Sequence, residues 1–415
     1  MNYATIAWRN LGRNRRRSAL SVTAVAVATL SIVLLFSLLE GMKSDLRSNL
    51  TTFYTGEVQI RHADYGTYEH LRPLHLSVKT PQLGDELAAL PEVEAAVSRL
   101  TVPGAVFQRD QRQGLLAVGV EFSREQVFSA IDDYLVAGDL GSMLQWAPGD
   151  HRRVSPAVVG NRVLDRLGIS LGEQFTVVAR TAYRGTNAMT FRAAAVADFP
   201  VETLNRQAFW IPLERAQTLA QMPGQVGEIL LRLSPAGEQD LPRTMTLLRD
   251  RAPTLELRHF SQMDTTYGLL EMASRAYNVI ALFFFLLAST VVVNTTMMAI
   301  FERRREIGTL EALGMRGSHL IRLFLTESAM LGLLGATAGL ALGVGLSLIL
   351  GHVGIDLGNA MSGVDFEISP VLHPVVNLRS SVGVFVFSLL VTVATTYLPT
   401  RRITRIEPVA ALREE

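Results

Sequence analysis

The sequence gathers several potential metal ligands between residues 62 and 75. They are His62, Asp64, His70 and His75. Imidazole and carboxylate groups bind zinc, but zinc sites use compact, recurring spacings such as the HExxH pattern on a helix. These four residues follow no such spacing, so the pattern favours a solvated loop over a metal site.

Motifs of hydrolases and of nucleotide-binding enzymes are absent from the sequence. It has no GxSxG nucleophile turn and no Ser/Lys hydrolase signature. It also lacks the GxxxxGK[ST] phosphate loop, and its only lysines, Lys43 and Lys79, lie in other contexts. The absence of cysteine excludes disulfides and thiolate metal sites. We therefore expect no catalysis, no cofactor, no nucleic-acid partner and no ATP hydrolysis by this chain alone.

The most distinctive charged stretch covers residues 302–327. Glu302 and Glu306 alternate with Arg303–Arg305, which predicts a charged amphipathic helix ending at Gly314. The apolar edge of this helix is formed by Ile307, Leu310 and Leu313. Two interpretations stay open: a surface that binds a partner protein, or a helix that lies in the lipid headgroup layer.

Four long apolar stretches surround these charged segments. A spanning helix needs roughly 20 apolar residues, and a helix is what satisfies the backbone of an isolated segment in hydrocarbon. The cores of the four stretches contain no Asp, Glu, Lys, Arg or His, which disfavours an ion-coupled transporter. The predicted membrane helices are residues 18–39, 277–301, 328–351 and 380–399.

The first apolar stretch has a competing interpretation as a signal peptide. Arginines precede it, and the residues Ala24 to Ala26 resemble a cleavage site. The apolar run continues past this point to Leu39, which is longer than a usual signal-peptide core. An uncleaved membrane helix is therefore favoured.

Arginine clusters predict the orientation of the four helices, because basic residues accumulate in cytoplasmic loops. Arginines crowd residues 9–17, 303–322 and 401–413, whereas the loop 352–379 carries Asp356, Asp365 and Glu367. Both termini are then cytoplasmic in a multi-pass membrane protein. The cytoplasmic segments are 1–17, predicted to be amphipathic, 302–327 and 400–415; the extracytoplasmic ones are 40–276 and 352–379.

Small and polar residues inside the spans predict helix contacts. Gly335, Gly339 and Gly343 share one helical face and allow close approach of another backbone. That backbone belongs either to a second subunit or to this chain, and the sequence favours neither. Hydrogen bonding between helices is expected of a polar trio in the second span, Asn294, Thr295 and Thr296.

The extracytoplasmic segment 40–276 is predicted to be a large α/β domain. Strand–helix–strand patterns occur in residues 50–100 and again in 210–265, which indicates a split βαβ sheet whose distant halves pair. The intervening residues 101–209 are predicted to form a strand-rich insertion. The expected fold is therefore a membrane protein with four transmembrane α-helices and this α/β domain between the first two.

Several motifs, in order along nearly the whole chain, resemble the FtsX/MacB/LolC-LolE class of ABC transporter permeases. The outer segments 158–175 and 209–220 look like the MacB-like periplasmic core of that class. The remaining motifs are AWRNLGRNRRRSAL (Ala7–Leu20), RRREIGTLEALG (Arg303–Gly314), Phe324–Glu327 before the glycine-rich span, and RRITRIEPVAALR (Arg401–Arg413).

The resemblance implies a mechanotransmission mechanism, of the type VII class. A separate cytoplasmic ABC ATPase dimer would bind ATP and Mg²⁺ and would move the membrane helices and the outer domain. Two permease subunits, identical or not, would pair among the membrane lipids. The residues matching the ATPase-coupling surface are Glu306, Ile307, Gly308, Leu310, Glu311, Ala312, Leu313 and Gly314.

Within this class the chain looks most like the lipoprotein-release permeases. It begins at the first membrane segment without the fused ATPase domain of MacB, and residues 55–65 match lipoprotein-release homologues. The expected function is release of lipoproteins or similar amphiphiles, with Arg180–Thr190 as a short loop for a periplasmic carrier. The alternatives are MacB-like efflux, an FtsX-like scaffold that activates an envelope hydrolase and, least favoured, a membrane-bound enzyme.

Overall fold

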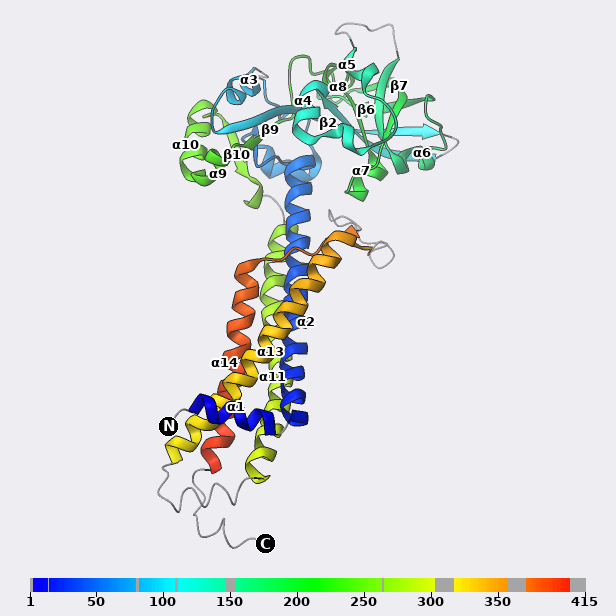
Figure 1. Ribbon diagram of the computed structural model, residues 1–415. Helices are drawn as coiled ribbons and strands as arrows, with labels where there is room; N and C mark the ends of the chain where they lie inside the picture. Colours follow the sequence, from blue (N-terminus) through cyan, green and yellow to red (C-terminus); the bar gives the residue numbers. More distant parts are fainter. Residues whose placement is uncertain are drawn as a thin grey trace. The chain divides into compact units, whose positions relative to one another are not determined.

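The computed structural model describes residues 3–13, 15–79, 82–108, 111–146, 154–262, 265–302, 317–356 and 371–403 (Figure 1). The chain divides into two compact units. The helical unit comprises Met1–Ser44, Gly268–Asn359 and Val371–Glu415. The α/β unit comprises Asp45–Tyr267 and Ala360–Pro370.

The helical unit contains the four expected membrane helices. Within the described residues, four helical segments are long and apolar enough to cross a membrane: Arg15–Tyr54, Arg275–Met298, Gly317–Val353 and Leu378–Tyr397. The helices of this unit, in chain order, are α1 (Tyr3–Arg13), α2 (Arg15–Asn49), α11 (Thr265–Glu302), α13 (Gly317–Val353) and α14 (Leu378–Ile403). A two-residue pairing of β11 (Ile355–Asp356) with β12 (Val371–Leu372) lies between the last two helices.

The helices extend beyond the apolar stretches that reveal them in the sequence. Helix α2 continues ten residues past Leu39 to Asn49 and then ends in a π-helical turn, η1 (Leu50–Tyr54). Helix α11 begins at Thr265, before the expected start at Tyr277. Hydropathy marks only the part of a helix that can contact lipid, whereas polar residues without proline continue the helix at little cost.

Apolar side chains from three helices form the core of the helical unit. Ile32 and Val33 of α2 are almost fully buried, and they cluster with Phe285 of α11 and Val384 of α14. Phe285 also meets Phe387 of α14 in an edge-to-face contact with ring centroids 5.1 Å apart. Packing of this kind, together with interhelical hydrogen bonds, holds membrane helices together where the hydrophobic effect is missing.

The described part of the α/β unit is built on one mixed sheet of ten strands, with the order β10-β1-β9-β2-β3-β8-β5-β7-β4 and with β6 paired to β2 and β7. The strands are β1 (Val58–His62), β2 (Val93–Gln108), β3 (Gln111–Val120), β4 (Leu135–Gly138), β5 (Ser155–Gly160), β6 (Gln174–Arg180), β7 (Thr186–Ala197), β8 (Ala208–Pro212), β9 (Glu228–Leu233) and β10 (Leu255–His259).

Short helices connect these strands. They are η2 (Tyr65–Leu71), α3 (Leu83–Ala88), α4 (Phe122–Ser129), η3 (Ile131–Tyr134), α5 (Gly141–Leu144), α6 (Asn161–Leu167), α7 (Glu202–Gln207), α8 (Leu213–Ala220), α9 (Pro235–Gln239), α10 (Leu241–Arg251) and η4 (Phe260–Gln262).

Four strands of the sheet form a split βαβ arrangement. One half is β1–α3–β2 and the other is β9–α10–β10, and their strands alternate in the order β10-β1-β9-β2. All three pairings are antiparallel. The distant halves of the sequence therefore share one sheet, as the repeated strand–helix–strand pattern indicates.

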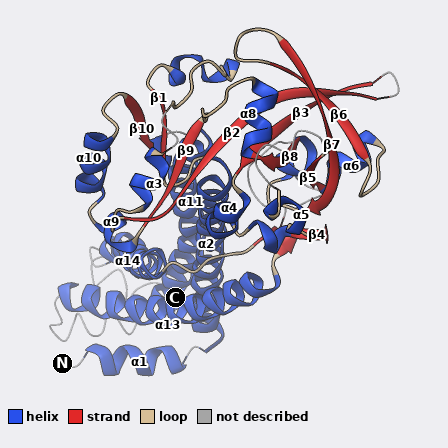
Figure 2. Ribbon diagram, turned by 90° about the horizontal axis from the view of Figure 1, so that it is seen from above, coloured by secondary structure: helices blue, strands red, loops and turns tan. Residues whose placement is uncertain are grey.

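Strand β2 joins this four-stranded part to the rest of the sheet (Figure 2). The sequence pattern ends the first half at residue 100, but β2 runs on to Gln108. Pro103 does not interrupt it, because β9 pairs with β2 only up to Arg99 and β6 pairs only from Gly104. A proline is tolerated in a strand where no neighbour needs its missing N–H.

Candidate functional site

The predicted ATPase-coupling residues, 306–314, lie outside the described residues. Next to them in the chain, α13 begins and contacts α1. The Tyr3 ring stacks on His319 at a centroid distance of 6.2 Å, and the Asn10 amide donates a hydrogen bond to the Glu327 carboxylate. Glu327 is only 6% exposed.

This contact brings together two motifs that are 300 residues apart in the chain, the opening Ala7–Leu20 stretch and Phe324–Glu327. Sequence reasoning identified both motifs but not their contact. The sequence did contain a signal for this contact: Glu327 lies at the edge of an apolar span. A buried acid needs a polar partner, so a contact with a polar residue could have been expected.

The glycine face of α13 packs against α2 of the same chain. A Cβ added to Gly335 would lie 2.7 Å from the Cβ of Val25, and one added to Gly343 would lie 3.0 Å from the Cβ of Val33. At Gly339 the added atom would clash with the carbonyl oxygen of Ala26. Of the two interpretations left open by the sequence, the structure shows the seam within the chain.

Hydroxyl groups link α2 to two further helices. The Ser21 and Thr295 hydroxyls lie 2.7 Å apart, which joins α2 to α11, and the Thr29 and Ser388 hydroxyls lie 2.9 Å apart, which joins α2 to α14. Thr295 therefore bonds to another helix, as expected for the polar trio in this span. Helix α2 is the common partner of α11, α13 and α14.

The four potential metal ligands are spread over several segments: His62 ends strand β1, and Asp64 and His75 lie in turns. The Nδ1 atom of His62 accepts a hydrogen bond from the backbone N–H of Asp64 at 3.2 Å, which ties these two residues into a local turn. His70 lies on η2, whose residues are not buried. Within the described ranges, no three His, Cys, Asp or Glu side chains are grouped as a metal ion would require.

The hairpin between β6 and β7 contains the expected carrier loop, Arg180–Thr190. Its turn is closed by the N–H of Thr181, which donates to the carbonyl of Gly185 at 2.9 Å, and by the Thr181 hydroxyl, which accepts from the N–H of Gly185. Tyr183 at the tip is 74% exposed. The hairpin offers an exposed aromatic side chain, and its role as a carrier loop stays a prediction.

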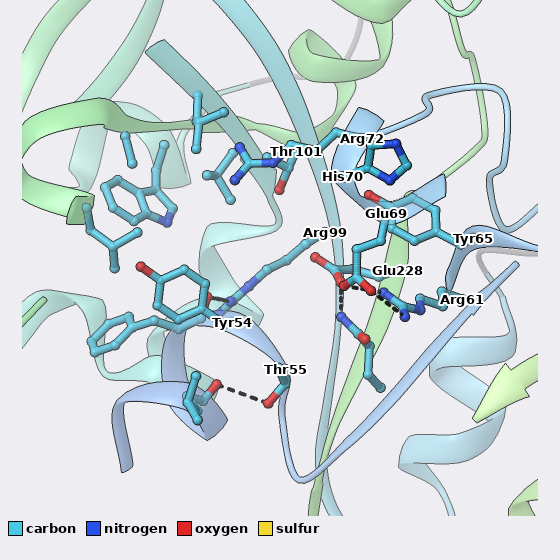
Figure 3. A pocket seen from close by; sticks show the side chains of 18 residues that line it. Tyr54, Thr55, Arg61, Tyr65, Glu69, His70, Arg72, Arg99, Thr101 and Glu228 are labelled. Carbon is cyan, nitrogen blue, oxygen red and sulfur yellow. Dashed lines mark hydrogen bonds and ion pairs between the residues drawn. The ribbon is translucent and has the colours of Figure 1, made fainter. Parts of the chain in front are cut away.

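The α/β unit contains a cavity of about 480 Å³, with an apolar and a charged side (Figure 3). The η1 turn at the end of α2 contributes Phe53 and Tyr54 to the apolar side, and β8 contributes Trp210. Strands β1, β9 and β2, together with η2, contribute the polar residues, among them Gln59 and Thr101. Small-molecule sites are usually concave and combine apolar walls with polar groups that fix the orientation of the ligand, and this cavity has a larger polar share than most.

A row of alternating charges crosses the sheet beside this cavity. Glu256 of β10 pairs in register with Arg61 of β1, Arg61 with Glu228 of β9, and Glu228 with Arg99 of β2. Residues directly opposite each other in antiparallel strands project from the same face. Pairing of the two distant halves of the sequence therefore creates the row.

Both arginines of the row are buried and bound to a further glutamate. Arg61 donates from Nη1 and Nη2 to the two carboxylate oxygens of Glu69, at 2.9 and 3.2 Å. Arg99 forms an ion pair with Glu125, and the side chains are 3% and 1% exposed. Each arginine therefore binds a carboxylate from outside the row, Glu69 for Arg61 and Glu125 for Arg99.

Arg99 also binds the end of α2. It donates to the carbonyl oxygens of Phe53 at 2.6 Å and Thr52 at 3.0 Å. Carbonyls in the last turn of a helix lack partners within the helix, and a cation there also interacts favourably with the helix dipole. The guanidinium therefore fixes the end of α2 to strand β2 and, through Glu125, to α4.

Burial controls the ionisation of several groups in the cavity. It raises the pKa of Glu228, and the positive charge of Arg99 opposes this rise. It also raises the pKa of Tyr65 to about 12. Conversely, the hydrogen bonds from Arg61 lower the pKa of Glu69. The sequence pointed to none of these residues, since their grouping depends on strand register.

Two known families match most of the chain. The family described as MacB-like periplasmic core domain matches residues 18–243, and the one described as FtsX-like permease C-terminal matches residues 278–408.

Curated relatives match along almost the full chain. The pyoverdine export ATP-binding/permease protein PvdT of Pseudomonas syringae pv. syringae is 24% identical, over 99% of this chain and 59% of its own length. The macrolide export ATP-binding/permease protein MacB of Rhodospirillum rubrum is 25% identical, over 99% of this chain and 60% of its own length. This chain therefore spans about three fifths of the relatives it matches.

Two solved structures resemble part of the chain. The periplasmic region of MacB from Actinobacillus actinomycetemcomitans is 13% identical, with a TM-score of 0.36, and the match covers 51% of this chain and 92% of that one. The extracellular domain of the noncanonic ABC-type transporter YknZ from Gram-positive bacteria is 12% identical, with a TM-score of 0.34, over 49% of this chain and 98% of that one.

Proposed function

Because the chain belongs to the family of ABC transporter permeases with a MacB-like periplasmic core and an FtsX-like C-terminal region, we propose that it couples a separate ATPase to movements of its α/β unit. The ATPase, a cytoplasmic dimer, binds ATP and Mg²⁺ and docks on residues 302–327. A second permease subunit completes the transporter in the bacterial inner membrane. The α/β unit and the loop 352–379 lie outside the cytoplasm, and both termini lie inside.

One observation carries the coupling mechanism. A single helical segment, Arg15–Tyr54, supplies both an apolar span and the end that Arg99 fixes to strand β2. In the helical unit the same segment contacts the other three spans through Gly339, Thr295 and Ser388. A shift of the spans is thereby passed to the sheet along one helix.

We propose an amphiphile of the outer leaflet, such as a lipoprotein, as the substrate. The four apolar cores contain no ionisable side chain, so they offer no polar path for such a molecule. Mechanical work by the α/β unit at the outer surface needs no such path. A second candidate, export of a substrate from the periplasm, is supported by the relatives, whose names specify pyoverdine and macrolide export.

The variant Leu310→Asp tests the coupling surface. A charge on the predicted apolar edge of the 302–314 helix should reduce the amount of ATPase that co-purifies with the permease by about tenfold, since a buried unpaired charge costs more than 1.4 kcal/mol. The matched control is Thr309→Asp, which adds the same charge off that edge. Both variants should reach the membrane normally.

Normal ATPase yield with Leu310→Asp would show that the coupling surface lies elsewhere. For the substrate, the wild-type complex should release bound lipoprotein when ATP is added. Stimulation of ATP hydrolysis by an export substrate, without lipoprotein release, would favour the second candidate.

A further inference from the structure

Among the described residues that line the cavity of the α/β unit, the Glu228 carboxylate has no ion-pair partner within 4.0 Å. Within the described residues, Arg61 forms ion pairs with Glu69 and Glu256, and Arg99 forms one with Glu125. Glu228 lies between these two arginines in the row, and in the described part of the chain its side chain accepts a hydrogen bond from the Gln59 amide instead of from either arginine. Arg61 and Arg99 therefore form their ion pairs with carboxylates other than that of Glu228.

Figure 3 shows Glu228 beside Glu69 and Arg61, with Arg99 extending toward Tyr54. The same cavity is lined by the aromatic side chains of Phe53, Tyr54 and Trp210. We propose that this cavity binds a small amphiphilic cation, a protonated amine with an apolar body, whose charge pairs with Glu228 and whose body packs against these aromatic side chains.

Charge and burial support a cation over an anion. Desolvation raises the pKa of Glu228, and the positive charges of Arg99 and Arg61 do not fully offset this rise, so a further cation at the carboxylate is favourable. Of the arginines that line the cavity, Arg61 and Arg99 already bind carboxylates, and Arg72 is exposed. Because charges interact more strongly where water is excluded, an ion pair with Glu228 outweighs one with Arg72. The aromatic faces also attract a cation.

The size of the cavity limits the ligand. A volume of about 480 Å³ lies within the roughly 300–1,000 Å³ range of small-molecule sites. One wall is the η1 turn at the end of α2, so a bound molecule touches the same turn that Arg99 fixes to β2. The ligand is therefore placed to change how firmly this helix end is held.

Three probes with the same apolar body but different charge test this proposal: 4-phenylbutylamine, 4-phenylbutanol and 4-phenylbutanoate. Trp210 reports binding by its fluorescence, after Trp8 and Trp146 are replaced by phenylalanine in the full chain. The protein is held in nanodiscs of zwitterionic lipid. The amine should bind about tenfold tighter than the alcohol, and the carboxylate weakest, because a hydrogen bond to a charged group is worth about 1.5–3 kcal/mol.

The variant Glu228→Gln keeps the shape of the side chain and should remove the preference for the amine. Glu121→Gln, at an exposed residue that does not line the cavity, is the matched control and should keep it. Leu116→Phe should weaken binding of all three probes by filling the cavity. No ATPase is needed, so the outcome is independent of the proposed coupling.

Three results would overturn the proposal. They are equal affinity of the wild type for amine and alcohol, tightest binding of the carboxylate, and an amine preference that survives in Glu228→Gln. Thermal unfolding of Glu228→Gln checks that the variant is folded. A midpoint temperature equal to or above that of the wild type shows that the lost preference for the amine does not come from misfolding.

Discussion

At the residue scale, the pair of Arg99 and Glu125 has the clearest structural role. Both side chains are almost completely buried, and Arg99 uses its remaining donors on the carbonyls of Thr52 and Phe53. A buried pair of this kind adds little net stability, but removing one partner leaves an uncompensated charge. Its main effect is to fix the position of the helix end.

The variant Arg99→Met should therefore lower the free energy of unfolding by about 3–5 kcal/mol, because Glu125 and two backbone carbonyls lose their partner. The control is Arg206→Met, which breaks an exposed pair with Glu202 and should cost about 0–1 kcal/mol. Thermal and urea unfolding of the purified full chain measures both. Similar losses in the two variants would contradict the buried role of Arg99.

Little of the charged row could be predicted from the sequence. Arg61, Glu228 and Arg99 are ordinary charged residues at strand positions, and no local pattern marks them. Their proximity follows from the register of β1 and β2 against β9, which joins segments more than 120 residues apart. Local motifs such as Ala7–Leu20 were recognisable because their residues are consecutive.

At the element scale, the contact between α2 and α13 depends on the absence of side chains. Gly339 leaves no room for a Cβ, since the carbonyl of Ala26 and the Cβ of Thr29 lie too close. Gly345 belongs to the same helix but has open space where a Cβ would be. The two glycines thus separate the effect of packing from that of helix propensity.

The variant Gly339→Ala should destabilise the helical unit by about 1–3 kcal/mol, the usual cost of overpacking. Gly345→Ala should be neutral or slightly stabilising, because alanine favours the helix by about 1 kcal/mol over glycine. Thermal unfolding in detergent, followed by circular dichroism, compares them. Equal destabilisation by both variants would mean that the close contact at Gly339 does not hold the helices together.

The sequence predicts the helices better than their ends. The length of the apolar stretches alone identified the four spans. It did not predict the continuation of α2 from Leu39 to Asn49, because hydropathy does not detect a helix made of polar residues. Strand β2 was cut short because its two halves have different neighbours, β9 and then β6. The first error reflects the limits of hydropathy, and the second arises because pairing with another strand decides where β2 ends.

At the scale of the whole molecule, the proposed function depends on which segments face the cytoplasm. The ATPase must reach residues 302–327, whereas the α/β unit must act on molecules outside. The even number of spans among the described residues predicts that both termini lie on one side, and the arginines of residues 9–17, 303–322 and 401–413 predict that this side is the cytoplasm.

Reporter fusions test this arrangement directly. Alkaline phosphatase inserted near residue 150 should be active, because it folds only outside the cytoplasm, and the same enzyme fused at the C-terminus should be inactive. A fluorescent protein that matures only in the cytoplasm should give the opposite pattern at these two sites. An inactive phosphatase near residue 150, in protein that is made and inserted, would place the α/β unit on the ATPase side. The spans would then have no outer unit to move, and the transporter mechanism would be wrong even though the fold is retained.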